Sequence, residues 1–354
     1  MVGAAQGLNA EREVLQGSWT TPVDDMDDGE NMPAHDPLRT IVQYCQQTIW
    51  PSYVKADQSA LRLQEKYRKR ATAAALLGSV AVALAIIQLY RGFQIPWSWI
   101  ISSAEGTAAV GTFAIIFLGI RASLKEEWLL QRFKAESLRL LKFRYIIESG
   151  QHAEKELRER LEEMSEEVEK ITCTTASVLQ GWLARGTVPR IAVLTARPQL
   201  TKESLHEIAH YYRAKRLRVQ LAYLRSRVQN YLMNDRKTRL FGPSFFFGSV
   251  AFVLAHLLVE IGRGPEAWSR ATIMIAALLP VAAAGFRTQR ASNEFARSAS
   301  RSEALQHVLT ELSERLRRAE GGLSMFQELE FCEQVLEADL REWMRLMAEA
   351  EWFG

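Results

Sequence analysis

Four stretches of the chain are almost entirely apolar, and they come in two pairs. The first pair covers residues 71–90 and 99–120, and the second covers residues 240–259 and 271–286. Residues 71–90 include no acidic or basic side chain, and at about 1.5 Å per helical residue they match the hydrocarbon thickness of a bilayer. The pattern predicts four membrane-spanning helices in two hairpins. The last span is the weakest, because it is short and contains Pro280.

The two pairs share a motif and an arrangement. Gly-Ser-Val-Ala stands at the same depth in the first span of each pair, at residues 78–81 and 248–251. A short turn separates the two spans of a pair, and a long charged segment follows the second span. We therefore expect an internally duplicated membrane protein.

Lysine and arginine side chains mark the open ends of the predicted hairpins. They crowd the polar segments before and after each pair of spans, whereas the first turn offers only Arg91. The second turn has Arg263 and Arg270, offset by Glu260 and Glu266. Because basic loops stay on the cytoplasmic side, we expect both turns outside and both termini in the cytoplasm. The prediction is a multi-pass protein of the cell inner membrane, with membrane lipid as a partner.

The remaining sequence predicts long cytoplasmic helices and coiled coils, so the predicted fold class is all-α. Apolar residues at alternating steps of three and four form a seam after each hairpin. The first seam is Leu157, Leu161, Met164, Val168, Ile171 and Val178, with Thr175 at the missing step; the second is Leu305, Leu309, Leu312, Leu316, Ala319 and Leu323. Such seams pack against each other or against a second copy, as in a homo-oligomer, and the pattern leaves both open.

Composition divides the chain further. Residues 1–36 are acidic, contain Gly and Pro and have no apolar core, which predicts a disordered acidic tail and no signal peptide. The predicted order is then a two-span hairpin domain at 37–150, a heptad helix at 151–185, a linker at 186–200, a second two-span hairpin domain at 201–302 and C-terminal cytoplasmic helices at 303–354. A net charge of +3 is too small to favour nucleic acid as a partner. Cys45, Cys173 and Cys332 show neither disulfide nor metal spacing.

One motif of metal chemistry lies between the two predicted hairpins. Residues 206–210 read His-Glu-Ile-Ala-His, and on a helix His206 and His210 share a face that could bind Zn²⁺, with Glu207 as general base. A zinc protease needs a third protein ligand, and no His-x-x-Gly-x-x-His extension follows. A membrane-embedded zinc metalloprotease is therefore the alternative. The simpler interpretation is a pair of solvent-facing histidines, with no metal, no cofactor and no enzymatic activity.

Polar side chains inside the predicted spans are the candidates for lining a pore. They are Ser102, Glu105, Thr107 and Thr112 in the second span, and His256 and Glu260 near the outer end of the third. Glu105 lies roughly 9 Å inside its span, where a carboxylate facing lipid would have to neutralise or reach water. Carboxylates around an axis would favour cations. The simpler alternatives are that Glu105 bonds Ser102 or Thr107 and that Glu260 only reaches water.

Several loose motifs surround the predicted hairpins in a definite order. Before the first hairpin stands Trp50-x-x-Tyr53-x-x-Ala56, followed by Tyr67 and Arg70, and before the second stands Tyr212-x-x-x-Arg216-Leu-x-x-Gln220-Leu-x-Tyr223. After the hairpins stand Trp128-x-x-x-Arg132-x-x-x-Glu136, Glu303-Ala-Leu305 and Glu333-x-x-Leu336-x-x-Asp339-x-x-Glu342-Trp343. Together they resemble the SLATT family of bacteria, the SMODS and SLOG-associating two-transmembrane effector domains. The resemblance covers most of the chain after Pro37. Many members have one hairpin, whereas this sequence predicts two in tandem.

The resemblance implies an integral membrane effector that forms pores or perturbs the membrane and kills an infected cell, in nucleotide-signalled anti-phage defence. It also implies a separate nucleotide-sensing partner, and the sequence contains neither a P-loop nor a Gly-rich dinucleotide fingerprint. The leading hypothesis is a homo-oligomeric pore or ion channel gated from the cytoplasmic helices. A zinc metalloprotease and a non-conducting membrane scaffold are the alternatives.

Overall fold

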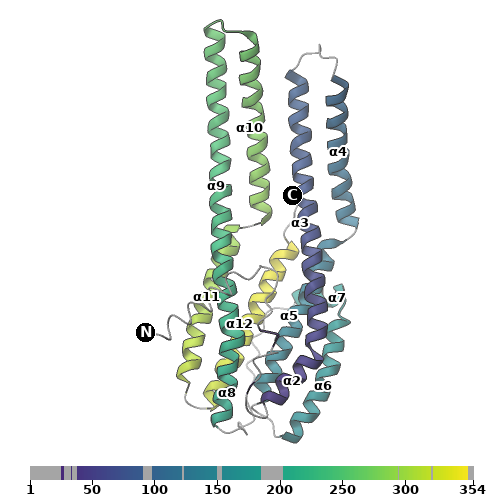
Figure 1. Cartoon of the computed structure of the whole chain (residues 1–354), viewed down its shortest axis with the longest axis vertical. Helices are drawn as coiled ribbons and strands as arrows, with labels where there is room; N and C mark the ends of the chain where they lie inside the picture. The colour runs from purple at the N-terminus through teal and green to yellow at the C-terminus, as the bar shows by residue number, and fades with distance from the viewer. Residues whose placement is uncertain are drawn as a thin grey trace. The chain divides into compact units, whose positions relative to one another are not determined.

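The structure is a computed structural model that describes residues 25–27, 33, 38–90, 98–121, 123–149, 154–184, 202–293, 295–319 and 322–349. In these ranges every regular element is a helix, as Figure 1 shows, so the all-α prediction is confirmed for them. In chain order the helices are α2 (Leu38–Thr48), α3 (Trp50–Tyr90), α4 (Ser98–Arg121), α5 (Leu124–Glu148), α6 (Glu154–Thr172), α7 (Ala176–Ala184), α8 (Lys202–Tyr212), the π-helix η1 (Arg213–Leu217), α9 (Arg218–Ile261), α10 (Glu266–Asn293), α11 (Phe295–Arg318) and α12 (Gly322–Glu349).

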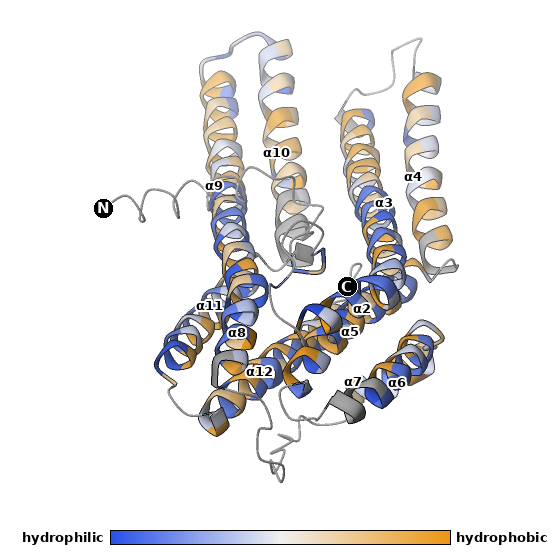
Figure 2. Ribbon diagram, turned by 60° about the horizontal axis from the view of Figure 1, so that its bottom comes forward, coloured by the Kyte–Doolittle hydropathy of each residue, from blue (hydrophilic) through white to orange (hydrophobic). Residues whose placement is uncertain are grey.

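Four of these helices are long and apolar enough to cross a membrane: α3, α4, α9 and α10. Figure 2 shows their apolar residues in orange along the hairpin ends of the four helices. At most 22% of any of the apolar windows is buried. Large apolar side chains such as Leu76, Phe113 and Phe247 are exposed there. Soluble proteins rarely leave apolar patches of this extent in water, so the four helices suggest a membrane protein.

The chain divides into two compact units, each assembled from separate stretches. Unit 1 comprises Met1–Gln64, Lys125–Val228 and Ser300–Glu349, and unit 2 comprises Glu65–Leu124, Gln229–Ala299 and Ala350–Gly354. The helices that flank the hairpins therefore gather in unit 1, and the units cut across the predicted hairpin domains at 37–150 and 201–302. The long helices α3 and α9 belong to both units, because each continues without interruption from unit 1 into unit 2.

Glycines set the spacing of the helices inside unit 2. A Cβ atom added to Gly78 on α3 would lie 3.7 Å from Thr112 Cγ2 on α4. One added to Gly248 on α9 would lie 3.2 Å from Leu279 Cδ1 on α10. The glycine of each Gly-Ser-Val-Ala motif thus faces the second helix of its own hairpin, where a missing side chain permits close approach. Pro280 lies inside α10, which remains helical over 28 residues and so extends beyond the short span predicted.

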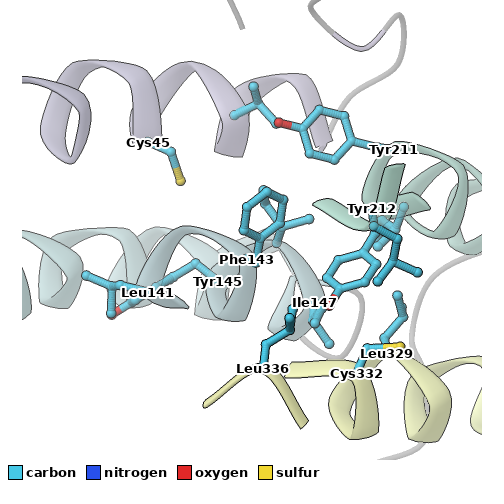
Figure 3. Packing of buried hydrophobic residues seen from close by; sticks show 14 of the residues in the cluster. Cys45, Leu141, Phe143, Tyr145, Ile147, Tyr211, Tyr212, Leu329, Cys332 and Leu336 are labelled. Atoms are coloured by element: carbon cyan, nitrogen blue, oxygen red, sulfur yellow. The ribbon is translucent and has the colours of Figure 1, made fainter. Parts of the chain in front are cut away.

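Most of the buried apolar side chains described in unit 1 form one cluster. Figure 3 shows its centre, where the ring of Tyr212 meets the ring of Phe143 edge-on, at 5.7 Å between centroids, and lies close to Leu329 and Cys332. Members of the second predicted seam, Leu305, Leu309, Leu312 and Leu316, are buried in the same core. That seam therefore packs within the chain.

The first predicted seam is divided between two helices. α6 ends at Thr172 and α7 begins at Ala176, so the heptad helix predicted over 151–185 is interrupted at the step assigned to Thr175. The hydroxyls of Thr172 and Thr174 donate to main-chain oxygens of the preceding turn, at 2.9 and 3.1 Å. Such bonds compete with regular helix geometry. Beyond the interruption, Val178 is 55% exposed and does not continue the seam.

A short turn at residues 25–27 lies in the core of unit 1. Met26 and Asp25 are both buried. The sequence predicts a disordered acidic tail over residues 1–36. Within that range, residues 25–27 are instead ordered, because Asp25 pairs with Arg139 and Met26 joins the apolar cluster. The linker predicted at 186–200 lies outside the described residues.

Candidate functional site

The turn end of the second hairpin holds a polar cluster that joins α9 to α10. Ser269 on α10 is buried, and its hydroxyl donates to Glu260 Oε1 and lies 3.2 Å from His256 Nδ1. His256 Nδ1 also lies 3.0 Å from the main-chain oxygen of Ser269. These contacts fit a His256 Nδ1–H that donates to both Ser269 oxygens, a tautomer assigned from the contacts. One serine therefore bridges the two predicted residues of the third span.

The polar side chains of α4 are not gathered into a comparable cluster. The hydroxyls of Thr107 and Thr112 donate to main-chain oxygens four residues earlier, at 2.7 and 2.8 Å, so both are satisfied within the helix. Ser102 is exposed and Glu105 is half-buried. Among the described residues, no hydrogen bond or ion pair joins Glu105 to Ser102 or Thr107. Its carboxylate remains available to water, an ion or another copy of the chain.

The His-Glu-Ile-Ala-His motif lies on α8. His206 and His210 are exposed, whereas Ile208 and Ala209 turn into the core of unit 1. Within the described part of the chain, no group of three His, Cys, Asp or Glu side chains is placed to hold a metal ion. The structure thus places the two histidines on one solvent-facing stripe without bringing a third described ligand to them.

Unit 1 contains a buried group of opposite charges, which we call the charge cluster. Its members are Asp25, Asp57, Arg132, Glu136, Arg139, Lys142, Arg216 and Glu333. The carboxylate of Asp25 lies between two guanidinium groups, with Oδ2 at 3.0 Å from Arg139 Nε and 3.4 Å from Arg216 Nη1. All three side chains are at most 5% exposed. Charges this deeply buried are stable only when they are paired.

Aromatic hydroxyls complete two sides of the charge cluster. Arg139 Nη2 donates to the Tyr53 hydroxyl at 2.5 Å, and burial raises the pKa of Tyr53 to about 12. On the other side, Tyr212 donates to Glu333 Oε1 at 2.7 Å. The guanidinium of Arg216 lies 4.8 Å from the centroid of the Phe143 ring, which adds a cation–π contact.

Burial and charge act in opposite directions on the carboxylates of the charge cluster. Burial by itself would raise the pKa of Glu136, but Arg132, Arg139 and Arg216 together lower it to about 2. At Asp57 burial is the stronger effect, so its pKa lies above the ordinary value although Arg132 opposes the shift. The three arginines therefore hold Glu136 in its charged form.

The π-helix η1 explains how Arg216 enters the charge cluster. In a π-helix each turn holds an extra residue, so the side chains that follow are rotated from their α-helical positions. Arg216 and Leu217, the last two residues of η1, are both buried. Short π segments recur at functional sites, so η1 supports the charge cluster as a candidate site.

The motif residues quoted for the SLATT resemblance belong to unit 1, except Tyr67 and Arg70, which belong to unit 2. Arg132, Glu136 and Arg216 belong to the charge cluster, and Trp128 packs against Trp343 with 5.9 Å between ring centroids. These motif residues therefore make structural contacts within unit 1. Comparison with protein-family models, curated proteins and solved structures finds no match for this chain. The family assignment stays a prediction that rests on these motifs.

Sequence reasoning missed Ser269, Asp25 and Arg139 as site residues. Ser269 follows a tryptophan at a predicted span end, and nothing local distinguishes it from a residue of the turn. Asp25 stands among other acidic residues in a segment without apolar periodicity. Arg139 could have been predicted as a partner of Glu136, since it falls one helical turn later on a helix rich in apolar residues.

Proposed function

We propose that the chain is an integral membrane effector that assembles into a homo-oligomeric pore or ion channel and is gated from unit 1. The observation that carries the proposal is the continuity of α3 and α9, which have 41 and 44 residues. At about 1.5 Å per residue each is a rod of roughly 60 Å that joins the packed core to an apolar span. A rearrangement in unit 1 would therefore be transmitted along two rods into the hairpins.

The charge and aromatic pattern of the hairpins supports insertion with both turns outside. Trp99 and Trp268 lie near the turn ends of their hairpins and are 67% and 65% exposed, as expected of aromatic residues at the membrane interface. Basic residues such as Arg68, Arg236 and Arg239 are exposed at the opposite ends. In this orientation unit 1 and both termini lie in the cytoplasm of a bacterial cell.

The pore would be lined by α4. Ser102, Glu105 and Thr112 are spaced to share one face of this helix, and Glu105 contributes a carboxylate with no ion pair among the described residues. Several copies of Glu105 around an axis would form a ring that favours cations. The polar cluster at Ser269 would hold the second hairpin closed at its turn.

Ion flux through liposomes tests this function. Purified full-length protein should release a cation reporter, and Glu105→Gln should lower the flux or weaken its preference for cations. Glu266→Gln is the matched control, because Glu266 lies exposed at the turn end of α10. An oligomer that inserts into liposomes but passes no ions contradicts the pore and favours a non-conducting scaffold.

The biological role that the SLATT resemblance implies is anti-phage defence, with a separate nucleotide-sensing partner as the trigger. The zinc metalloprotease alternative has its own test, since stoichiometric zinc that is lost in His206→Ala would support it. Among the described residues, no specific contact favours either the zinc metalloprotease or the non-conducting scaffold.

A further inference from the structure

Four cationic side chains from two helices converge on the turn at residues 25–27. We call them the cation cradle: Arg139 and Lys142 of α5, and Lys215 and Arg216 of η1. In each of these contacts the turn contributes an oxygen atom. Its side-chain contribution is the Asp25 carboxylate, which lies between the two arginines at 3.0 and 3.4 Å.

The two lysines of the cation cradle bind the main chain of the turn. Lys142 Nζ donates to the main-chain oxygens of Asp25 and Met26, at 2.8 and 3.2 Å. Lys215 Nζ donates to the main-chain oxygen of Asp27 at 3.1 Å. The turn therefore occupies the cradle with one carboxylate and three main-chain oxygens, the kind of atoms that a bound anion would supply.

The fit of Asp25 in the cation cradle is incomplete. Among the described residues, Arg139 Nε has no hydrogen-bond acceptor, although it lies 3.0 Å from Asp25 Oδ2, and the second carboxylate oxygen, Oδ1, has no donor. Asp25 Oδ2 accepts a hydrogen bond from Arg216 Nη1, so the carboxylate aligns with only one of the two arginines. A tetrahedral oxyanion presents acceptors in more directions and could accept from the arginines and Lys142 together.

The charge balance of this region also requires an anion at that position. Without Asp25, the charge cluster would retain four cations, Arg132, Arg139, Lys142 and Arg216, against three anions, Asp57, Glu136 and Glu333. The cations are carried by α5 and η1, whose main-chain bonds are made within the helices. When the turn leaves, the four cations therefore stay in place and the charge cluster lacks one negative charge.

We infer that the cation cradle is an oxyanion-binding site, that the turn at residues 25–27 is its resident intramolecular ligand, and that the phosphate group of a diffusible phosphate ester competes with the turn. A diffusible ester suits the site better than a lipid headgroup, because Asp25, Lys142 and Arg216 are buried in unit 1. Displacement of the turn would remove the Asp25 bridge between Arg139 of α5 and Arg216 of η1, the segment that continues directly into α9. The inference does not require that the hairpins conduct ions.

Phosphate binding by Asp25→Ala tests the inference. Inorganic phosphate is titrated by calorimetry into full-length protein in detergent at constant ionic strength. A tethered ligand competes at an effective concentration of about millimolar or higher, so Asp25→Ala should bind phosphate at least about tenfold more tightly than the parent chain. Glu162→Ala is the control, because it removes one negative charge from an exposed position of α6 and should leave binding unchanged. Adding Arg216→Gln to Asp25→Ala should abolish the gain.

Asp25→Asn covers the case in which the alanine variant does not fold, because it keeps the side-chain size and removes the charge. For this variant, phosphate should raise the melting temperature more than it does for the parent chain. Methyl phosphate should reproduce the effect, and vesicles of phosphatidylglycerol should not, which separates a diffusible ester from a lipid. Equal phosphate responses in the parent chain, both Asp25 variants and Glu162→Ala, or a gain that survives Arg216→Gln, would overturn the inference.

Discussion

The Tyr212 hydroxyl donates a hydrogen bond of 2.7 Å to Glu333, a residue 121 positions later in the chain. Arg216 Nε donates to the same carboxylate oxygen at 3.1 Å. Burial, reinforced by the charge of Glu333, raises the pKa of Tyr212 well above its ordinary value, so the phenol keeps the proton that it donates. The bond ties the segment before the second hairpin to the segment after it, inside unit 1.

Removal of this hydroxyl should destabilise unit 1. Tyr212→Phe leaves a buried carboxylate oxygen with one donor fewer, which should lower the free energy of unfolding by about 1–3 kcal/mol in detergent. Tyr145→Phe is the matched control, because the Tyr145 hydroxyl is buried without a hydrogen-bond partner among the described residues. Its loss should be neutral or stabilising. Equal losses in the two variants would contradict the role assigned to the Tyr212–Glu333 bond.

Acid should destabilise unit 1 through Glu136. Its pKa is about 2 in the folded chain against an ordinary 4.5, so its contribution is present above the ordinary pKa and disappears as the pH falls from about 4.5 towards 2. The shift corresponds to a contribution on the order of 3 kcal/mol, from a side chain that is 13% exposed. Glu136→Gln should flatten the stability curve in this pH window. Glu162→Gln, at an exposed position of α6, should leave the curve unchanged.

Ser269 should secure the turn end of the second hairpin. Ser269→Ala deprives Glu260 and His256 of their shared partner, and we expect a loss of about 1–2 kcal/mol, seen as a lower melting temperature in detergent. Ser244→Ala is the control within the same hairpin, since the Ser244 hydroxyl donates to Leu240 O of its own helix at 2.8 Å. If both serines can be replaced without effect, the cluster does not stabilise the hairpin.

Cysteine labelling in intact cells should reveal the topology. Cys173 is exposed, whereas Cys45 and Cys332 are buried, so the parent chain carries its own reporter for the side on which unit 1 lies. A membrane-impermeant maleimide should label Cys173 only after the cells are opened. With Cys173 replaced by serine, Arg263→Cys in the α9–α10 turn should be labelled in closed cells. Labelling of Cys173 from outside would invert the proposed orientation.

The predictions that the structure confirms concern features that depend on residues close together in the sequence. A long apolar run or a three–four repeat is visible within one segment, and so the four apolar helices and the buried Leu309 and Leu312 could be foreseen. The charge cluster could not, because its partners lie far apart, as with Arg216 and Glu333, which are 117 positions apart. No local periodicity encodes such a pair. The buried position of Asp25 could not be predicted for the same reason, since its partners lie on α5 and η1.

The glycines of the two Gly-Ser-Val-Ala motifs meet neighbours at different distances. A methyl group at Gly78 would rest at 3.7 Å from Thr112, an ordinary contact, whereas one at Gly248 would press on Leu279 at 3.2 Å. The two hairpins therefore differ at this position: a small side chain fits at position 78, whereas position 248 accepts only glycine unless Leu279 moves. Helix packing in the second hairpin is consequently more sensitive to added volume at its Gly-Ser-Val-Ala glycine than packing in the first hairpin.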